Sequence, residues 1–115
     1  MLKNKPIKEL VKIIANRSQC NIKVGAVIYD NYGIFAWGWN HSGDGFGACA
    51  ERNAIARANR KRLKDSSIII IAFRKSKEIC SFPCPKCYSV IKACKIESIY
   101  CVNQNKEWIK YETKE

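Results

Sequence analysis

The chain has 115 residues, 47% of them hydrophobic and 27% charged, and its formal net charge is +11 at pH 7. This length predicts a single domain over residues 1–115, built around one core. No apolar run reaches the roughly 18 residues of a membrane-spanning helix, and a signal-peptide pattern is lacking, so we expect a cytoplasmic protein without a membrane partner. The basic balance favours an anionic partner and allows a nucleic acid.

The first half of the chain predicts a helix, two strands and a second helix. Apolar residues recur at helical spacing over 7–14. Residues 22–29 and 34–39 are typical of two strands that form a hairpin. A glycine-rich loop over 40–47 then leads to a helix predicted from 49 to about 62.

The second half predicts three further strands and one helix. Residues 68–73 form a continuous apolar run, typical of a central strand covered on both faces. A helix is predicted over 84–94 and a strand over 98–102. If 107–113 is also a strand, it must run antiparallel to its predecessor, because a parallel crossover needs about a dozen residues or more. The alternative is a frayed tail or a short helix.

Two short strings carry the chemistry: Cys49-Ala50-Glu51 and, further on, Pro83-Cys84-Pro85-Lys86-Cys87. Three cysteines can occupy three corners of a tetrahedral zinc site and leave the fourth for water, which is typical of a catalytic site. Cys84 and Cys87 are three residues apart, so both can point the same way from the first turn of a helix. The helix dipole there favours the thiolate form.

Three other residues complete the picture of this metal site. Glu51 is not needed as a ligand, so it is free to move protons. Three thiolates leave the zinc site with net negative charge, and a guanidinium from Arg52 on a ligand sulfur would restore some Lewis acidity. A solvated helix charge is the other interpretation of Arg52. His41, the single histidine of the sequence, could instead complete a closed structural site.

The strings Cys-Ala-Glu-Arg-Asn-Ala at 49–54 and Phe-Pro-Cys-Pro-Lys-Cys at 82–87 resemble the cytidine deaminase superfamily. Residues 18–28 and 38–40 also resemble its deoxycytidylate deaminase branch, and the likeness covers about residues 6–101. The resemblance implies an α/β fold, a three-layer α-β-α sandwich with a five-stranded mixed sheet. It also favours the subgroup in which the last two strands are antiparallel, and relatives that assemble as homodimers or homotetramers.

The resemblance implies roles for individual residues. Zinc would be held by Cys49, Cys84 and Cys87, and Glu51 would carry a proton from water to the ring nitrogen and then to departing ammonia. The candidate substrate-binding residues are Val24, Asn40, His41, Phe46, Ala50 and Phe82. The candidate phosphate-binding residues are Lys23 and Lys86.

Three functions remain open at this point. The favoured one is hydrolytic conversion of cytosine to uracil in a free nucleoside or nucleotide: cytidine, deoxycytidine or their phosphates. The alternative is a polynucleotide deaminase that acts on cytosine in single-stranded DNA or RNA, or on adenosine in tRNA. A zinc-stabilised binding module without catalysis is the third. A cysteine as first ligand is typical of the free-nucleoside enzymes, but their Asn-x-Glu-Asn string is absent, since Asn40 is followed by His41 and Ser42.

Basic and aromatic residues each allow two interpretations. The basic residues of 57–64 could hold phosphate or could complement the negative end of a helix dipole. Phe35, Trp37 and Trp39 alternate on a strand, so all three are expected on one face, where core packing is the favoured role. Cysteines outside the motif are expected to be small buried apolar residues: Cys20, Cys80, Cys94 and Cys101.

Overall fold

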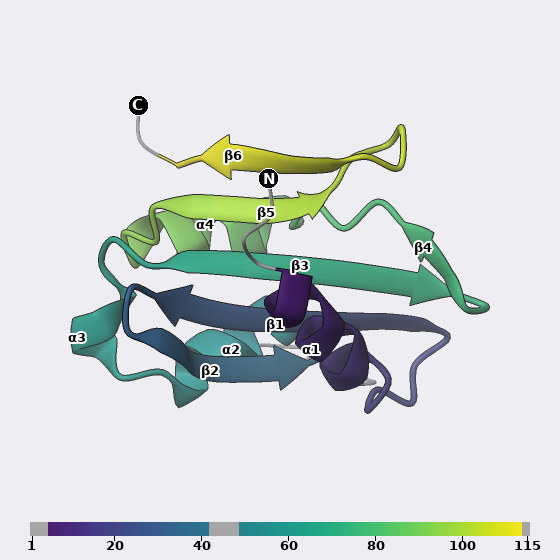
Figure 1. Ribbon diagram of the computed structural model, residues 1–115, viewed down its shortest axis with the longest axis horizontal. Coiled ribbons are helices and arrows are strands. Elements are labelled where there is room, and N and C mark those ends of the chain that lie inside the picture. Colours follow the sequence, from purple (N-terminus) through teal and green to yellow (C-terminus); the bar gives the residue numbers. More distant parts are fainter. Residues whose placement is uncertain (1–4, 42–48, 114–115) are drawn as a thin grey trace.

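A six-stranded mixed sheet with helices on both faces forms the framework of the molecule (Figure 1). The computed structural model describes residues 5–41 and 49–113. In chain order the elements are α1 (Lys5–Ala15), β1 (Ile22–Asp30), β2 (Gly33–Trp39), α2 (Ala50–Arg57), α3 (Arg60–Leu63), β3 (Ser67–Arg74), β4 (Lys77–Ile79), α4 (Pro85–Ala93), β5 (Ser98–Val102) and β6 (Trp108–Glu112).

The strands follow the order β2-β1-β3-β5-β6, and β4 pairs with β3 beside this path. Only β3 and β5 are parallel to each other; every other pairing in the described residues is antiparallel. The last two strands are antiparallel, as the short connection between them predicted. The predicted sandwich of helices around a mixed sheet is confirmed, but the predicted count of five strands is wrong. The sixth strand, β4, is too short for its periodicity to be visible in the sequence.

Helix α1 covers one face of the sheet, where it lies in front of β1 and β3 in Figure 1. Its buried residues Val11 and Ile14 pack on Val27, Ile69 and Ile71. A close approach is possible because β1 carries a glycine at position 25. A Cβ there would lie 2.7 Å from the backbone nitrogen of Ala15.

Helices α2 and α4 cover the opposite face, which holds the larger part of the core. A second glycine has the same function here, because a Cβ on Gly38 would lie 2.6 Å from the backbone nitrogen of Ala54 in α2. Helix α2 therefore lies directly against β2. The buried residues of this face are Ala26, Ile28, Ala36, Ala50, Ala54, Leu63, Ile68, Ile70, Ile91, Ile96, Ile99 and Cys101.

Two predictions about local structure are wrong. The helix expected over 49–62 is broken, because Ala58 has extended backbone angles that end α2 before α3 begins. The three aromatic residues of β2 do not share a face. The pairing of β1 with β2 is irregular between Ile28 and Tyr29, and Phe35 packs with the α2 side, whereas Trp39 packs with the α1 side.

A membrane-spanning helix is not found among residues 5–41 and 49–113, whose helices are all too short and too polar for that role.

Candidate active site

Three cysteine sulfurs converge where α2 and α4 begin. Cys49 is the N-cap residue of α2, Cys84 is the N-cap residue of α4, and Cys87 lies in the first turn of α4. Their sulfur atoms all lie within 4.8 Å of one another. Three thiol groups gathered this closely are a donor set that fits zinc, which binds cysteine thiolates. In the described residues, no other His, Cys, Asp or Glu ligand atom joins the cluster.

The beginning of α4 makes its two thiols chemically different. Backbone N–H groups of Cys87 and Lys86 point at the sulfur of Cys84 and lower its pKa. Burial raises the pKa of the Cys87 thiol, which is only 1% exposed. The site therefore supplies one thiol that ionises readily and one that needs a cation to stabilise its thiolate.

Arg52 lies against the cysteine cluster, in the way that the sequence suggested. Its Nη2 atom is 3.3 Å from the sulfur of Cys49, and this contact raises the pKa of the guanidinium. A positive group on a ligand sulfur withdraws negative charge from the metal site. The interpretation of Arg52 as a fully solvated helix charge does not fit this contact.

Glu51 is buried beside the cysteines, with only 7% of its surface exposed. Burial raises the pKa of its carboxyl group, and the nearby charge of Arg52 opposes this shift. A carboxyl group with a raised pKa can both accept and return a proton near neutral pH, which general acid–base catalysis requires. Its place at the second residue of α2 puts it two residues after Cys49, outside the group of three cysteines.

A cavity of about 310 Å³ opens in front of these residues. This volume is at the lower end of the roughly 300–1,000 Å³ typical of small-molecule sites. Its walls are largely apolar, with polar groups from the cysteine cluster and its surroundings. The lining residues are Ile22, Val24, Asn40, Cys49, Ala50, Glu51, Ala72, Ile79, Cys80, Ser81, Phe82, Cys84 and Cys87.

Four of the six residues expected to bind substrate line this cavity. They are Val24, Asn40, Ala50 and Phe82. Phe82 is 43% exposed, stacks on the ring of Tyr88 and meets the ring of Tyr111 edge to face. Phe46 lies outside the described residues.

Asn40 has a structural role that the sequence did not reveal. Its Nδ2 donates to the carbonyl of Ile22 at 2.8 Å, and its Oδ1 accepts from the N–H of Val24 at 2.9 Å. The amide group thus binds the main chain of β1 and continues the ladder beyond the end of β2. One N–H and one lone pair of the amide remain for a ligand.

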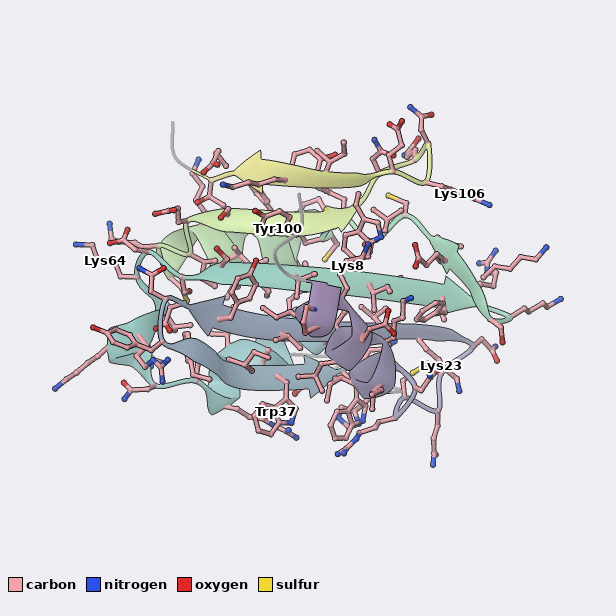
Figure 2. The ribbon with its side chains drawn as sticks, in the orientation of Figure 1. Lys8, Lys23, Trp37, Lys64, Tyr100 and Lys106 are labelled. Carbon is pink, nitrogen blue, oxygen red and sulfur yellow. The ribbon has the colours of Figure 1, made fainter. Side chains whose placement is uncertain are left out.

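The structure does not bring His41, Lys23 or Lys86 to the cavity wall. The ring of His41 lies 5.7 Å from that of Trp39 and is outside the cysteine cluster, so the closed-site alternative loses its fourth ligand. Lys23 pairs with Phe73 on the α1 face, at the end of the sheet where β1 begins (Figure 2). The side chain of Lys86 is exposed to solvent.

Two residues that precede the second motif were missed. Ser81 is buried, donates to the carbonyl of Ile70 and accepts from the N–H of Val102, at 2.9 Å in each case. Cys80 lines the cavity and is exposed, so the prediction of a buried apolar role for it is wrong. Both positions depend on β4, and a three-residue strand gives no periodic signal.

A comparison with protein families gives the class to which this fold and cysteine cluster belong. Residues 3–103 match the family described as the cytidine and deoxycytidylate deaminase zinc-binding region. The chain belongs to this family. A comparison with curated proteins gave no match.

Solved structures with the same fold include two kinds of deaminase. The cytidine deaminase from Burkholderia pseudomallei has a TM-score of 0.72 and 21% identity, covering 97% of this chain and 94% of that chain. The dCMP deaminase from the cyanophage S-TIM5, in apo form, has a TM-score of 0.65 and 25% identity, covering 88% of this chain and 86% of that chain. The same phage protein in complex with dCMP and dUMP has a TM-score of 0.67 and 22% identity, covering 90% and 85%.

Proposed function

We propose that this protein is a zinc-dependent hydrolytic deaminase that converts cytosine to uracil in a free nucleoside or nucleotide. Water adds to C4 of the ring, the bond from C4 to the amino nitrogen breaks, and ammonia leaves. The substrates would be cytidine, deoxycytidine or their phosphates. Family membership and the phage dCMP deaminase, solved with dCMP and dUMP, support this choice of base.

The convergence of three cysteine sulfurs and one buried carboxyl group on a single cavity carries this proposal. Cys49, Cys84 and Cys87 would hold the zinc ion, which supplies a Lewis acid and makes water nucleophilic near neutral pH. A structural zinc site would have four protein ligands, and the described residues bring together only three. A zinc ion held by these three cysteines would have its fourth position free for the reacting water.

Glu51 would carry the protons. Its carboxylate accepts one proton from the attacking water and passes it to N3 of the ring. It then takes the second proton from the new hydroxyl group at C4 and gives it to the amino group, which leaves as ammonia as the C4 carbonyl forms. One carboxyl group can do all of this only if its pKa is close to working pH, and burial raises the pKa of Glu51 in that direction.

The apolar walls would hold the pyrimidine ring. Val24, Ala72 and Ile79 lie side by side across three strands on one wall, and Phe82 offers an exposed ring for stacking. Asn40 retains one N–H and one lone pair toward a ligand. We assign it to positioning the wall as well as to substrate contact, because its other amide atoms bind β1.

Product mass spectrometry tests the proposal. Zinc-loaded protein would be incubated with cytidine, deoxycytidine, their mono- and triphosphates, adenosine, and single-stranded oligonucleotides that contain cytosine or adenine. We expect a gain of about one dalton, from replacement of the amino group by oxygen, in a free nucleoside or nucleotide.

Glu51→Gln should abolish that gain, and Glu9→Gln, which removes an exposed carboxylate on α1, is the matched control. A gain confined to the oligonucleotides would instead establish the polynucleotide deaminase. Full activity of Glu51→Gln would contradict the proposed role of the carboxyl group.

A further inference from the structure

The register of the sheet places two cations directly beyond the cavity. Val24, Ala72 and Ile79 form a row across β1, β3 and β4, and all three line the cavity. Residues two positions apart on a strand share a face and are separated by about 7 Å. Two positions further along β3 is Arg74, and its partner on β4 is Lys77. Both side chains therefore belong to the cavity face, one row beyond the wall that would hold the base.

A second hollow lies beside Arg74 and next to the cavity. It has a volume of about 580 Å³ and is lined by Asn21, Ile22, Arg74 and Lys75. Ile22 also lines the cavity in front of the cysteines, so the two spaces share a wall. Apart from Glu51, no acidic residue belongs to either lining in the described part of the chain. An anion that extends from the cavity along β3 would thus meet positive charge only.

Arg74 and Lys77 are held next to each other by a tight turn. The two residues between them, Lys75 and Ser76, have φ of 50° and 68°, as a two-residue hairpin requires. Like charges directly opposite each other on a sheet are destabilising. Both side chains are exposed, and the ion pairs found within 5–41 and 49–113 involve neither. Glu78 pairs with Phe73 and so belongs to the α1 face.

We propose that Arg74 and Lys77 bind the 5′-phosphate of the substrate, so that the enzyme acts on a cytosine nucleotide in preference to the nucleoside. This inference rests on the proposed deaminase function. The pentose of a nucleotide separates base from phosphate by a span comparable to the single row between wall and cations. A guanidinium binds two phosphate oxygens in its planar fork, while the lysine adds a point charge. Binding of a phosphate dianion replaces the repulsion between the two cations by attraction.

The test compares nucleotide with nucleoside in two matched double variants. Arg74→Gln/Lys77→Gln removes the proposed phosphate site. Arg60→Gln/Lys64→Gln removes the same two charges from exposed positions, and Figure 2 shows Lys64 at the opposite end of the sheet from β4. The measured quantity is kcat/KM for cytidine and deoxycytidine, each with and without a 5′-monophosphate. Thermal unfolding of each variant confirms that it is folded.

We expect wild-type protein to favour the monophosphate. Arg74→Gln/Lys77→Gln should lower the ratio of kcat/KM for nucleotide over nucleoside about 10- to 100-fold, as for the loss of charged hydrogen bonds. The control variant should leave that ratio within about twofold. Arg74→Lys should retain part of the preference that the double variant loses, because the charge is kept. A ratio that falls equally in both double variants would overturn the assignment, and so would activity confined to oligonucleotides. Wild-type protein that deaminates neither form would contradict the proposed function itself. Active protein that ignores the phosphate would contradict only this inference.

Discussion

The two ends of strand β3 use the same kinds of side chain for different purposes. At the amino end, Arg62 donates to both carboxylate oxygens of Asp30, at 2.7 and 3.0 Å, and lies 4.3 Å from the ring of Phe35. At the carboxyl end, Arg74 faces another cation, Lys77, beside the cavity. The first arginine is bound within the fold, and the second is available to a ligand. A count of charges does not distinguish the two, whereas the pairing of strands does.

The basic segment 57–64 illustrates the same lesson. The sequence singled it out as a candidate for binding phosphate, yet two of its arginines take part in packing. Arg57 lies 5.1 Å from the ring of Trp39, and Arg62 pairs with Asp30. Basic residues near the β3–β4 turn are fewer and did not stand out. Their position beside the cavity makes them the better candidates.

The largest expected effect comes from Glu51→Gln, in the cavity beside the carboxyl end of β3. We expect the rate of ammonia release to fall by about 10²- to 10⁴-fold, the usual contribution of a general acid–base group. The free energy of unfolding of the metal-free protein should not fall, because burial raises the pKa of this carboxyl group and so disfavours its charged form. Ammonia release and urea unfolding measure the two effects. A variant that loses stability and activity together would show that Glu51 acts through the fold.

The next prediction compares the zinc content and the stability of variants at two buried thiols on the same face of the sheet. Cys87 belongs to the metal cluster, while Cys101 lies in the core. Cys87→Ser should lose most bound zinc, because the site drops to two thiolates. Cys101→Ser should keep its zinc and lose about 1–3 kcal/mol of stability, because its hydroxyl is buried without a designed partner. Zinc content measured by mass spectrometry and unfolding by urea give the answer; equal zinc in both variants would refute the assignment.

A smaller effect should appear at the two glycines against which helices pack. Gly25→Ala and Gly38→Ala each force a Cβ into contact with a helix backbone, at 2.7 and 2.6 Å. Each should cost about 1–3 kcal/mol of stability, as overpacking does. Gly38→Ala should also lower kcat, because it displaces α2, which carries Glu51. Gly25→Ala displaces α1 and should lower stability alone. Similar kcat in both variants would show that α2 tolerates the displacement.

The smallest effect is at the amino end of β3 and depends on pH. Hydrogen bonds from Arg62 lower the pKa of Asp30 below its usual 3.8. Stabilisation from this pair is therefore complete above the ordinary pKa, and it is lost as pH falls through the lowered value. We expect the difference in urea midpoint between wild type and Asp30→Asn to be constant above about pH 5 and to shrink in more acidic solution. A difference that persists unchanged in acid would mean that the carboxylate charge is not the cause.

The pairing of the two α4 cysteines and the outline of the fold were predictable because both depend on local pattern. The spacing of Cys84 and Cys87 alone places two sulfurs on one side of a helix start. The short segment before β6 fixed its antiparallel direction. The meeting of Cys49 with this pair is a distant contact, and it was predicted from the resemblance to the deaminase family.

The remaining errors concern contacts that the local pattern does not contain. The irregular pairing near Tyr29 moved Phe35 to the other face, and no periodicity in β2 signals it. Lys23 was a candidate for phosphate, but its pairing with Phe73 puts it on the α1 face. Asn40 lines the cavity as expected of a substrate contact, but its additional bonds to β1 depend on two strands meeting and were not predicted. Register between strands decided each case.

Ser81 has a consequence for the kinetics of metal exchange. Ser81 lies three residues before Cys84, and its hydroxyl group joins Ile70 in β3 to Val102 in β5. The segment that leads into the two proposed zinc ligands of α4 is thus anchored to β3 and β5. Release of a bound metal to a chelator would then require local opening of that region rather than movement of a surface loop. The rate of metal loss and the hydrogen exchange of the Val102 amide should depend on denaturant in the same way, and a metal that leaves faster than this amide exchanges would exclude such coupling.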